Sequence, residues 1–201
     1  MFESDVIKKG INDQAVLQAM RDVDRRKFVS DKFSDVAYDD RALPIGEEQT
    51  ISQPFIVAFM TESLQVEKGN KVLEVGTGSG FQTAVLSKLG AKVSTIEINK
   101  KLFKESLRRL TGLGYGDISF YHGDGNEGVP EQSPYDRILV TAAPAEIPRV
   151  LLGQLAKNGI MVIPVGNQSE VQYLYRIKKL DDDKIEKEKI LPVHFVPLIK
   201  S

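Results

Sequence analysis

The ten residues from Lys71 to Gly80 (KVLEVGTGSG) constrain the fold more than any other segment of the chain. Val72–Val75 is a short apolar run with one acid, which is typical of a buried parallel strand. It is followed by glycines at alternate positions: Gly76, Gly78 and Gly80. Residues 81–89 then show the spacing of an amphipathic helix. A strand, a glycine-rich turn and a helix in this order predict the opening of a nucleotide-binding βαβ unit.

The second strand of this predicted unit ends on an acid. Gly90 ends the helix, residues 92–96 form another apolar run, and Glu97 follows it. Because glycine lacks a Cβ atom, the glycine turn lets the backbone approach a ligand closely. A carboxylate about 20 residues past the first glycine is placed to accept both hydroxyls of a ribose. We therefore expect a ligand that contains ribose.

The loop spacing and Glu74 narrow the choice of ligand. Dinucleotide oxidoreductases use G-x-G-x-x-G, whereas this loop reads G-x-G-x-G. A carboxylate at Glu74 would repel a pyrophosphate held at the following helix N-terminus. It suits a ligand with a cationic end, and S-adenosylmethionine carries an ammonium, a sulfonium and no phosphate. A glycine turn that merely links strand to helix is the structural alternative.

Length and composition fit one α/β domain with a full core, since 201 residues are short for two domains. The 27 basic and 28 acidic residues give a net charge of −1, so we expect no nucleic-acid partner. The absence of cysteine and the presence of only two histidines argue against disulfides, a catalytic thiol and a metal site. The N-terminus lacks the apolar core of a signal peptide, and no stretch approaches transmembrane length. We expect a cytoplasmic protein without a membrane partner.

Residues 1–70 are predicted to form an N-terminal extension of helices and loops. Asn12 or Asp13 can cap a helix that runs to Met20, and residues 28–33 indicate a short helical turn. The segment 38–49, with its proline and glycine, predicts an irregular loop. Pro54 suits the first turn of a helix over residues 55–64, where its missing N–H costs nothing.

Residues 71–201 alternate strands and helices. After the first two strands, further strands are predicted at residues 118–122, 137–141 and 160–164, with helices over 99–110 and 148–155. Residues 172–180 and 190–199 have no helix between them, so they should pair antiparallel around a solvated, charged tip at 181–189. The pattern predicts a single domain, residues 1–201, with a doubly wound, Rossmann-like parallel sheet and an antiparallel edge.

Several candidate residues follow predicted strands and should meet at one sheet edge, where such folds bind ligands. Asp124 can accept the exocyclic amino group of adenine while Gly125 brings its N–H near the ring, although a plain Asp-Gly turn is the alternative. Thr141 and Ala142 end the fourth strand without the Asn/Asp-Pro-Pro-aromatic loop of amino-group methyltransferases, which argues against DNA amino methylation. Ser52 lies just before a helix, so it is either an N-cap or a hydroxyl donor at the reacting centre.

A set of motifs in order resembles the protein-L-isoaspartate O-methyltransferase family. They comprise Tyr38–Gly46, Gln49–Pro54, Val72–Gly80, Gly123–Gly125 with Gly128, Pro134–Asp136, Val140–Ala143, Pro164–Gly166 and Phe195–Leu198. The block from Thr50 to Pro54 (TISQP) is far more specific than the glycine loop. Phe81 stands where the family usually has tyrosine, and Val57 stands where animal relatives tend to carry histidine. Contacts made by those family residues are therefore not carried over.

The resemblance implies methyl transfer from S-adenosyl-L-methionine to the free α-carboxylate of L-isoaspartyl residues in damaged proteins. The ester would close to a succinimide, whose hydrolysis returns part of the material to aspartate. The implied cofactor contacts are Thr50, Ser52, Gln53, Glu74, Gly76, Thr77, Gly78, Gly80, Glu97, Ile98, Asp124, Gly125 and Thr141. Ser52 would orient the acceptor as the catalytic residue, with Ile51 and Val196 beside the peptide.

Other functions remain open at this level. A small-molecule or RNA methyltransferase could share the core, although the neutral charge and lack of a basic arm argue against RNA. A non-catalytic S-adenosylmethionine-binding protein would not be expected to keep Ser52 and the block around it. An NAD-dependent oxidoreductase conflicts with the glycine spacing and the long extension before the first strand. We expect a monomer.

Overall fold

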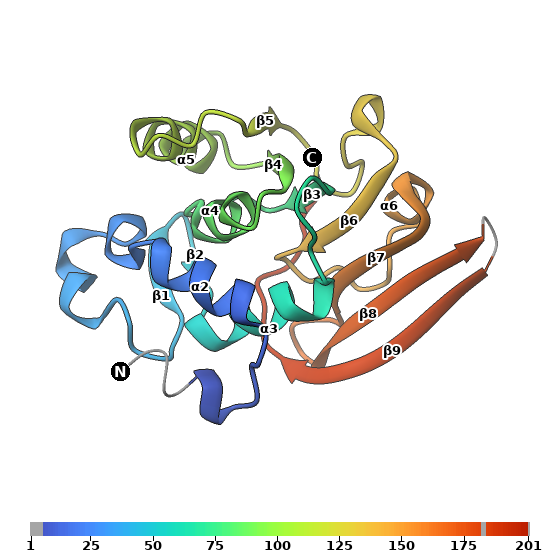
Figure 1. The fold of residues 1–201 in the computed structure, drawn as a ribbon, viewed down its shortest axis with the longest axis horizontal. Coiled ribbons are helices and arrows are strands. Elements are labelled where there is room, and N and C mark those ends of the chain that lie inside the picture. Colours follow the sequence, from blue (N-terminus) through green and yellow to red (C-terminus); the bar gives the residue numbers. More distant parts are fainter. Residues whose placement is uncertain (1–5, 182–183, 201) are drawn as a thin grey trace.

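The computed structural model describes residues 6–181 and 184–200 and is built around one seven-stranded sheet (Figure 1). The strand order is β5-β4-β3-β6-β7-β8-β9. The strands span β3 Lys71–Val75, β4 Lys92–Glu97, β5 Ser119–His122, β6 Tyr135–Val140, β7 Leu155–Val165, β8 Gln172–Asp181 and β9 Lys184–Val193. Strands β3 to β7 pair in parallel, and β8 and β9 add antiparallel pairs at the edge. The predicted doubly wound sheet with an antiparallel edge is confirmed.

The helices fall close to where the sequence predicts them, and side-chain caps fix the start of two of them. They are α2 Gln14–Asp22, α3 Pro54–Leu64, α4 Phe81–Lys88, α5 Lys100–Gly112 and α6 Arg149–Gln154, with 3₁₀ turns at η1 Arg25–Phe28, η2 Asp31–Val36 and η3 Pro130–Gln132. The Asp13 side chain accepts hydrogen bonds from the first turn of α2, and the Asn99 side chain does the same for α5. Asp13, and not Asn12, is therefore the cap of α2.

Alternating strand residues give the sheet two apolar faces. Val72 and Val162 pack on the face covered by the N-terminal extension, α3 and α4, whereas Leu73 and Met161 pack on the face covered by α6. All of these side chains are buried. Burial on both faces explains why the central strands are continuous apolar runs.

The register of the central strands brings their carboxyl ends to the same level. Val75 at the end of β3 pairs with Ile96 on β4 and with Val140 on β6. The residues that follow, which include Gly76, Glu97 and Thr141, therefore meet at one edge of the sheet. This is the edge at which the sequence predicted a ligand site.

Residues 38–49 are not an irregular loop throughout, so that prediction was wrong in part. They contribute to a hairpin of β1 Leu43–Gly46 and β2 Gln49–Ile51. Strands of three and four residues are too short to show a clear alternation, and Pro44 and Gly46 masked them further. The hairpin matters because it brings the Thr50–Ser52 segment to the sheet edge.

The C-terminal strand was also misplaced. The charged segment was expected to form a hairpin tip, but Lys184–Lys189 belongs to β9; residues 182 and 183 lie outside the described part. Lysine side chains of β9 lie over aromatic rings of the neighbouring strand β8. Lys187 Nζ, for example, is 4.1 Å from the centroid of the Tyr175 ring. Charges of this kind suit an exposed edge strand because they oppose pairing with another chain.

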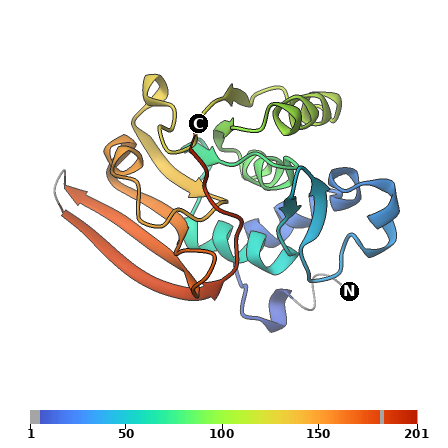
Figure 2. The same cartoon turned by 180° about the vertical axis from the view of Figure 1, so that it is seen from behind.

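Beyond β9, residues 194–200 form an irregular segment and not the predicted strand. Figure 2 shows this segment running from the end of β9 past the central strands to the C-terminus. It is held at Ala143, which lies after β6: Ala143 N donates to Val196 O and Leu198 N donates to Ala143 O, both at 2.8 Å. The segment thereby becomes part of the ligand edge.

The β1–β2 turn carries backbone strain that a substitution can test. Glu47 and Glu48 have φ angles of 51° and 56°, a left-handed conformation that costs a residue with a Cβ about 1–2 kcal/mol. We expect Glu48→Gly to raise the free energy of unfolding by about 0.5–1 kcal/mol, measured by urea denaturation. The control Glu186→Gly, in the interior of β9, should lower it. A loss of stability in Glu48→Gly would contradict a strained turn.

Candidate active site

A cavity of about 660 Å³ lies at the carboxyl ends of β3, β4 and β6. Its walls come from the glycine loop, the β1–β2 hairpin, α3, the loop after β6 and the C-terminal segment. The predicted site residues that line it are Thr50, Ile51, Ser52, Gly76, Thr77, Gly78, Glu97, Ile98, Gly125, Thr141 and Val196. Residues of the β1–β2 hairpin and of the C-terminal segment thus meet in one chamber.

Four predicted site residues are not among those that line this cavity. Gln53 is the N-cap of α3, and Gly80 is the left-handed N-cap of α4. Asp124 Oδ1 accepts hydrogen bonds from the backbone N–H and the side-chain amide of Asn126, each at 2.8 Å. Glu74 is fully buried behind the cavity wall. These residues lie next to residues that form the cavity walls.

The glycine loop is closed on one side by Thr141. Gly76 has φ +94°, and a Cβ placed on it would lie 2.4 Å from Thr141 Oγ1. That hydroxyl lies 2.7 Å from Gly76 O and 2.9 Å from Val75 O, so it ties the end of β6 to the loop. A Cβ on Gly125 would similarly lie 2.5 Å from Val75 Cγ1. Bare backbone is therefore required at both positions.

Glu97 is 7 % exposed and is held by backbone donors on both oxygens. Gly78 N donates to Oε2 and Asn99 N donates to Oε1, each at 2.9 Å. Each carboxylate oxygen can accept a second hydrogen bond. A pair of fixed acceptors at the cavity wall fits the vicinal hydroxyls of a ribose, as the sequence predicted.

Glu74 belongs to a buried network beneath the loop. Its Oε2 accepts from the Thr83 and Thr95 hydroxyls, and the Thr95 and Thr77 hydroxyls lie 2.7 Å apart. Because the Thr95 proton is given to Glu74, Thr77 must donate to Thr95. Thr77 lines the cavity, so the network joins the loop to β4 and α4. The expectation that Glu74 faces the cationic end of the ligand does not match this placement.

Burial raises the pKa of Glu74 from 4.5 to about 8, while the threonine hydrogen bonds oppose the shift. A carboxyl whose pKa is raised by folding stabilises the fold below pH 4.5, and this stabilisation is lost as the pH rises to about 8. Glu74→Gln should remove the loss. Its free energy of unfolding relative to wild type should therefore increase between pH 5 and pH 9, as measured by urea denaturation. A constant difference for Glu74→Gln would contradict a buried neutral carboxyl.

Ser52 lines the cavity and does not cap α3. The N-cap position belongs to Gln53, which makes no side-chain capping bond. The donor Phe55 N is satisfied by Asp40 Oδ1 at 2.9 Å. No hydrogen bond of the Ser52 hydroxyl is found within the described part of the chain, whereas its carbonyl accepts from Arg25 Nη2 at 2.7 Å. The hydroxyl is therefore available to a ligand.

Sequence reasoning missed three polar residues that hold the site. Asp40 caps α3, Arg25 holds the Ser52 carbonyl, and Gln172 fixes the C-terminal segment. Gln172 is buried, and its amide bonds both the N–H and the carbonyl of Phe195. These contacts join residues 15 to 27 positions apart, so no local pattern indicated them.

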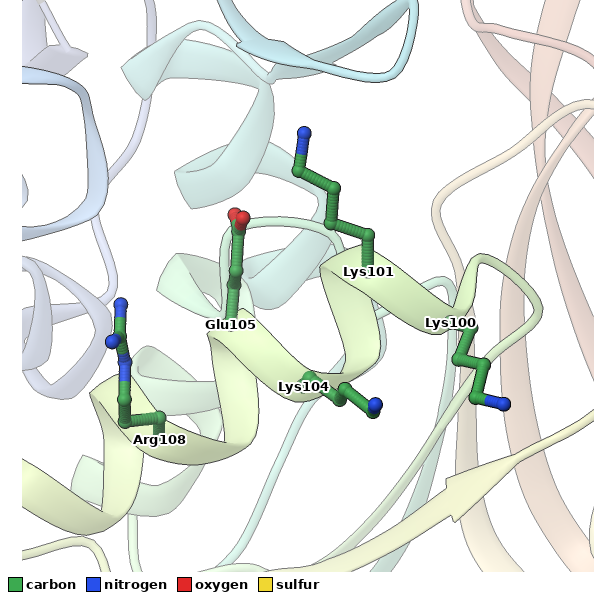
Figure 3. A pocket seen from close by; sticks show the side chains of 5 residues that line it. All are labelled: Lys100, Lys101, Lys104, Glu105 and Arg108. Atoms are coloured by element: carbon green, nitrogen blue, oxygen red, sulfur yellow. The ribbon is translucent and has the colours of Figure 1, made fainter.

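A second concavity lies along the outer face of α5 (Figure 3). It differs from the cavity at the strand ends because charged residues alone line it. It is lined by Lys100, Lys101, Lys104, Glu105 and Arg108, all from one helix. Within it, Lys101 Nζ lies 2.9 Å from Glu47 Oε1 of the β1–β2 turn. Because all of these side chains come from one exposed helix, they indicate a solvated charged surface and not a ligand-binding site.

Within residues 6–181 and 184–200, no acidic or histidine cluster could hold a metal, and no helix could span a bilayer.

Comparison with known proteins decides the family. The model of the protein-L-isoaspartate(D-aspartate) O-methyltransferase family matches residues 2–201. The chain belongs to this family. The protein-L-isoaspartate O-methyltransferase of Gloeobacter violaceus is 47 % identical over 201 residues, which is all of this chain and 98 % of that protein. The enzyme of the same description from Dictyoglomus turgidum is 50 % identical over 190 residues, 94 % of this chain and 86 % of that one.

Solved structures agree. A protein-L-isoaspartate O-methyltransferase structure superposes with a TM-score of 0.89 at 31 % identity and covers 98 % of this chain, which spans 64 % of that longer chain. A beta-aspartate methyltransferase from Plasmodium falciparum, in complex with S-adenosyl-L-homocysteine, superposes with a TM-score of 0.85 at 27 % identity, over 100 % of this chain and 97 % of that one. The chain is thus an S-adenosylmethionine-dependent protein-L-isoaspartate O-methyltransferase, and the oxidoreductase, RNA-methylating and non-catalytic alternatives are set aside.

Proposed function

We propose that the cavity performs this reaction with the acceptor carboxylate at Ser52 and the methyl donor along the strand ends. One observation carries the proposal: the Ser52 hydroxyl shares one chamber with the glycine loop and Glu97. This proximity supports a methyl-donor site and an acceptor site within the same chamber.

The cavity walls fit S-adenosylmethionine, which when bound supplies a methyl group activated by a sulfonium. Glu97 would accept the ribose hydroxyls, and the bare backbone of the glycine loop would face the amino-acid part of the ligand. Gly125 and Ile98 would flank the base, with Asp124 behind them.

The reaction requires little from the protein except alignment. A carboxylate with an ordinary pKa near 4 is already ionised at neutral pH, so no general base is needed. Ser52 would donate one hydrogen bond to the acceptor carboxylate and fix the direction from which the other oxygen approaches the methyl group. Placing both reactants in line can supply several kcal/mol of the barrier.

The peptide would lie between the β1–β2 hairpin and the C-terminal segment. Ile51 and Val196 line the cavity from these two sides. The Val196 carbonyl accepts a hydrogen bond from Ala143 N, and Phe195 is held by Gln172, so hydrogen bonds within the chain fix the position of this wall. Segments of this kind can bind a peptide through its backbone, which suits an enzyme that accepts many sequences around the isoaspartyl residue.

The substrates are isoaspartyl proteins, as the family implies. We further propose that the enzyme acts as a monomer. We propose a cytoplasmic location, as is typical of the family.

A repair time course tests the proposal. An isoaspartyl peptide incubated with enzyme and S-adenosylmethionine should convert to the aspartyl peptide through a succinimide, as followed by chromatography. Omission of S-adenosylmethionine should stop the conversion. Accumulation of a stable ester without succinimide would show that a carboxylate other than the isoaspartyl α-carboxylate is methylated.

A further inference from the structure

Arg25 is a buried cation beside the proposed acceptor site. Its side chain is 0 % exposed. Nε donates to Ala37 O and Nη2 donates to Ser52 O, both at 2.7 Å. Nη1 is also buried, and no hydrogen-bond partner for it is found in the described part of the chain. One edge of the guanidinium is thus left unsatisfied.

No acid neutralises this charge at close range. Among the described residues, no carboxylate lies within 4 Å of the Arg25 nitrogens. Asp40 raises the pKa of Arg25 through space, but its oxygens accept hydrogen bonds from Phe55 N and Lys9 Nζ. Burial lowers the pKa of Arg25 to about 10, which still leaves it charged at neutral pH. A buried cation without a paired anion is costly, so its retention requires a reason.

The charge lies directly behind two residues of the cavity wall. The guanidinium carbon stands 4.9 Å from the centroid of the Phe81 ring, and Nη2 holds the Ser52 carbonyl. Both Phe81 and Ser52 line the cavity, whereas Arg25 does not. Positive potential therefore reaches the cavity at the place where the Ser52 hydroxyl is available.

We propose that Arg25 is a positioning residue for the acceptor carboxylate, which it attracts electrostatically from behind the Ser52–Phe81 wall. The inference rests on the proposed function, because it takes the isoaspartyl α-carboxylate as the anion at Ser52. Arg25 has two effects. It fixes the backbone that presents the hydroxyl, and it supplies the opposite charge without touching the substrate.

The charge should act on binding and not on the chemical step. As a carboxylate oxygen bonds to the methyl carbon, the carbon–sulfur bond breaks and its electron pair stays on sulfur. The acceptor loses its negative charge along this path. A fixed cation therefore stabilises the bound carboxylate at least as well as the transition state, which lowers KM without raising kcat.

A binding cycle isolates the electrostatic effect. An isoaspartyl peptide with a free α-carboxylate is compared with the same peptide carrying an α-carboxamide, in calorimetric titrations with S-adenosylhomocysteine present. In the wild type, the carboxamide should bind roughly 10-fold or more weakly. In Arg25→Gln this discrimination should fall to about 2-fold, and in Arg25→Lys, which keeps the charge, most of it should return. Equal discrimination in wild type and Arg25→Gln would overturn the proposal.

Kinetics separates positioning by charge from a purely structural role. Arg25→Gln should raise KM for the isoaspartyl peptide roughly 10-fold with kcat nearly unchanged, and Arg25→Lys should restore KM. Equal losses of kcat in both variants would show that only the Ser52 hydrogen bond matters. If Arg25→Gln weakens S-adenosylhomocysteine as strongly as the peptide, the charge serves the cofactor carboxylate and the proposal fails.

A second variant tests the charge without touching Arg25 and is expected to fold. Asp40→Asn keeps an oxygen for Phe55 N but removes the acid that acts on Arg25 through space. It should tighten binding of the carboxylate peptide about 2- to 5-fold and leave the carboxamide unchanged. No change, or weaker binding, would contradict the inference. A wild-type enzyme that ignores both peptides would instead refute the proposed function itself.

Discussion

Glu97→Ala is expected to weaken S-adenosylhomocysteine binding roughly 100-fold or more. The Glu97 oxygens are held in place by Gly78 N and Asn99 N and can each accept one ribose hydroxyl. A hydrogen bond to a charged group contributes about 1.5–3 kcal/mol, so the loss of two corresponds to about 3–6 kcal/mol. Calorimetric titration of the variant measures the effect.

Glu97→Gln serves as the matched comparison. It keeps the shape and one acceptor oxygen but loses the charge, so its affinity should lie between those of wild type and Glu97→Ala. Circular dichroism must show both variants folded, because the alanine also leaves two backbone N–H groups without their acceptor. Unchanged affinity in a folded Glu97→Ala would remove this residue from the cofactor site.

Ser52→Ala is expected to lower kcat/KM for an isoaspartyl peptide roughly 10- to 150-fold. The loss corresponds to one hydrogen bond to a charged acceptor, about 1.5–3 kcal/mol. Affinity for S-adenosylhomocysteine should change little. Because Asp40 and not Ser52 satisfies the start of α3, the melting temperature should also stay close to that of wild type.

The structural control for Ser52 is Asp40→Ala, which removes the acceptor of Phe55 N. That variant should lose about 0.5–2 kcal/mol of stability, as expected for a lost helix cap. A Ser52→Ala variant that is destabilised but kinetically normal would reverse the assignment. The acceptor carboxylate would then have to be held by backbone N–H groups.

Local sequence signals predicted the central part of the site. The glycine loop, Glu97 and the Asn99 cap all depend on patterns of a few residues, and the parallel register brings them together. Glu74 was recognised as unusual, but its direction was not, because a strand residue can face either side of a sheet. Its bonds to Thr83 and Thr95 show that it faces a helix and a neighbouring strand.

The remainder depends on long-range contacts or on weak patterns. Arg25 and Gln172 give no local signal, because each acts on backbone far along the chain. The short β1–β2 hairpin lacks a readable alternation, and β9 consists largely of charged residues that an edge strand tolerates. Residues 194–200 resemble a strand in composition, yet they form a single bridge to Ala143.

The central claim is that the chamber joins a methyl donor to an isoaspartyl carboxylate aligned by Ser52. The most direct measurement is the initial rate of labelled methyl transfer to an isoaspartyl peptide beside its aspartyl twin, with and without a chelator. Label should enter the isoaspartyl peptide alone as a base-labile ester, at a rate that the chelator does not alter. Equal labelling of both peptides, or labelling of neither by a folded enzyme that binds S-adenosylhomocysteine, would contradict the account.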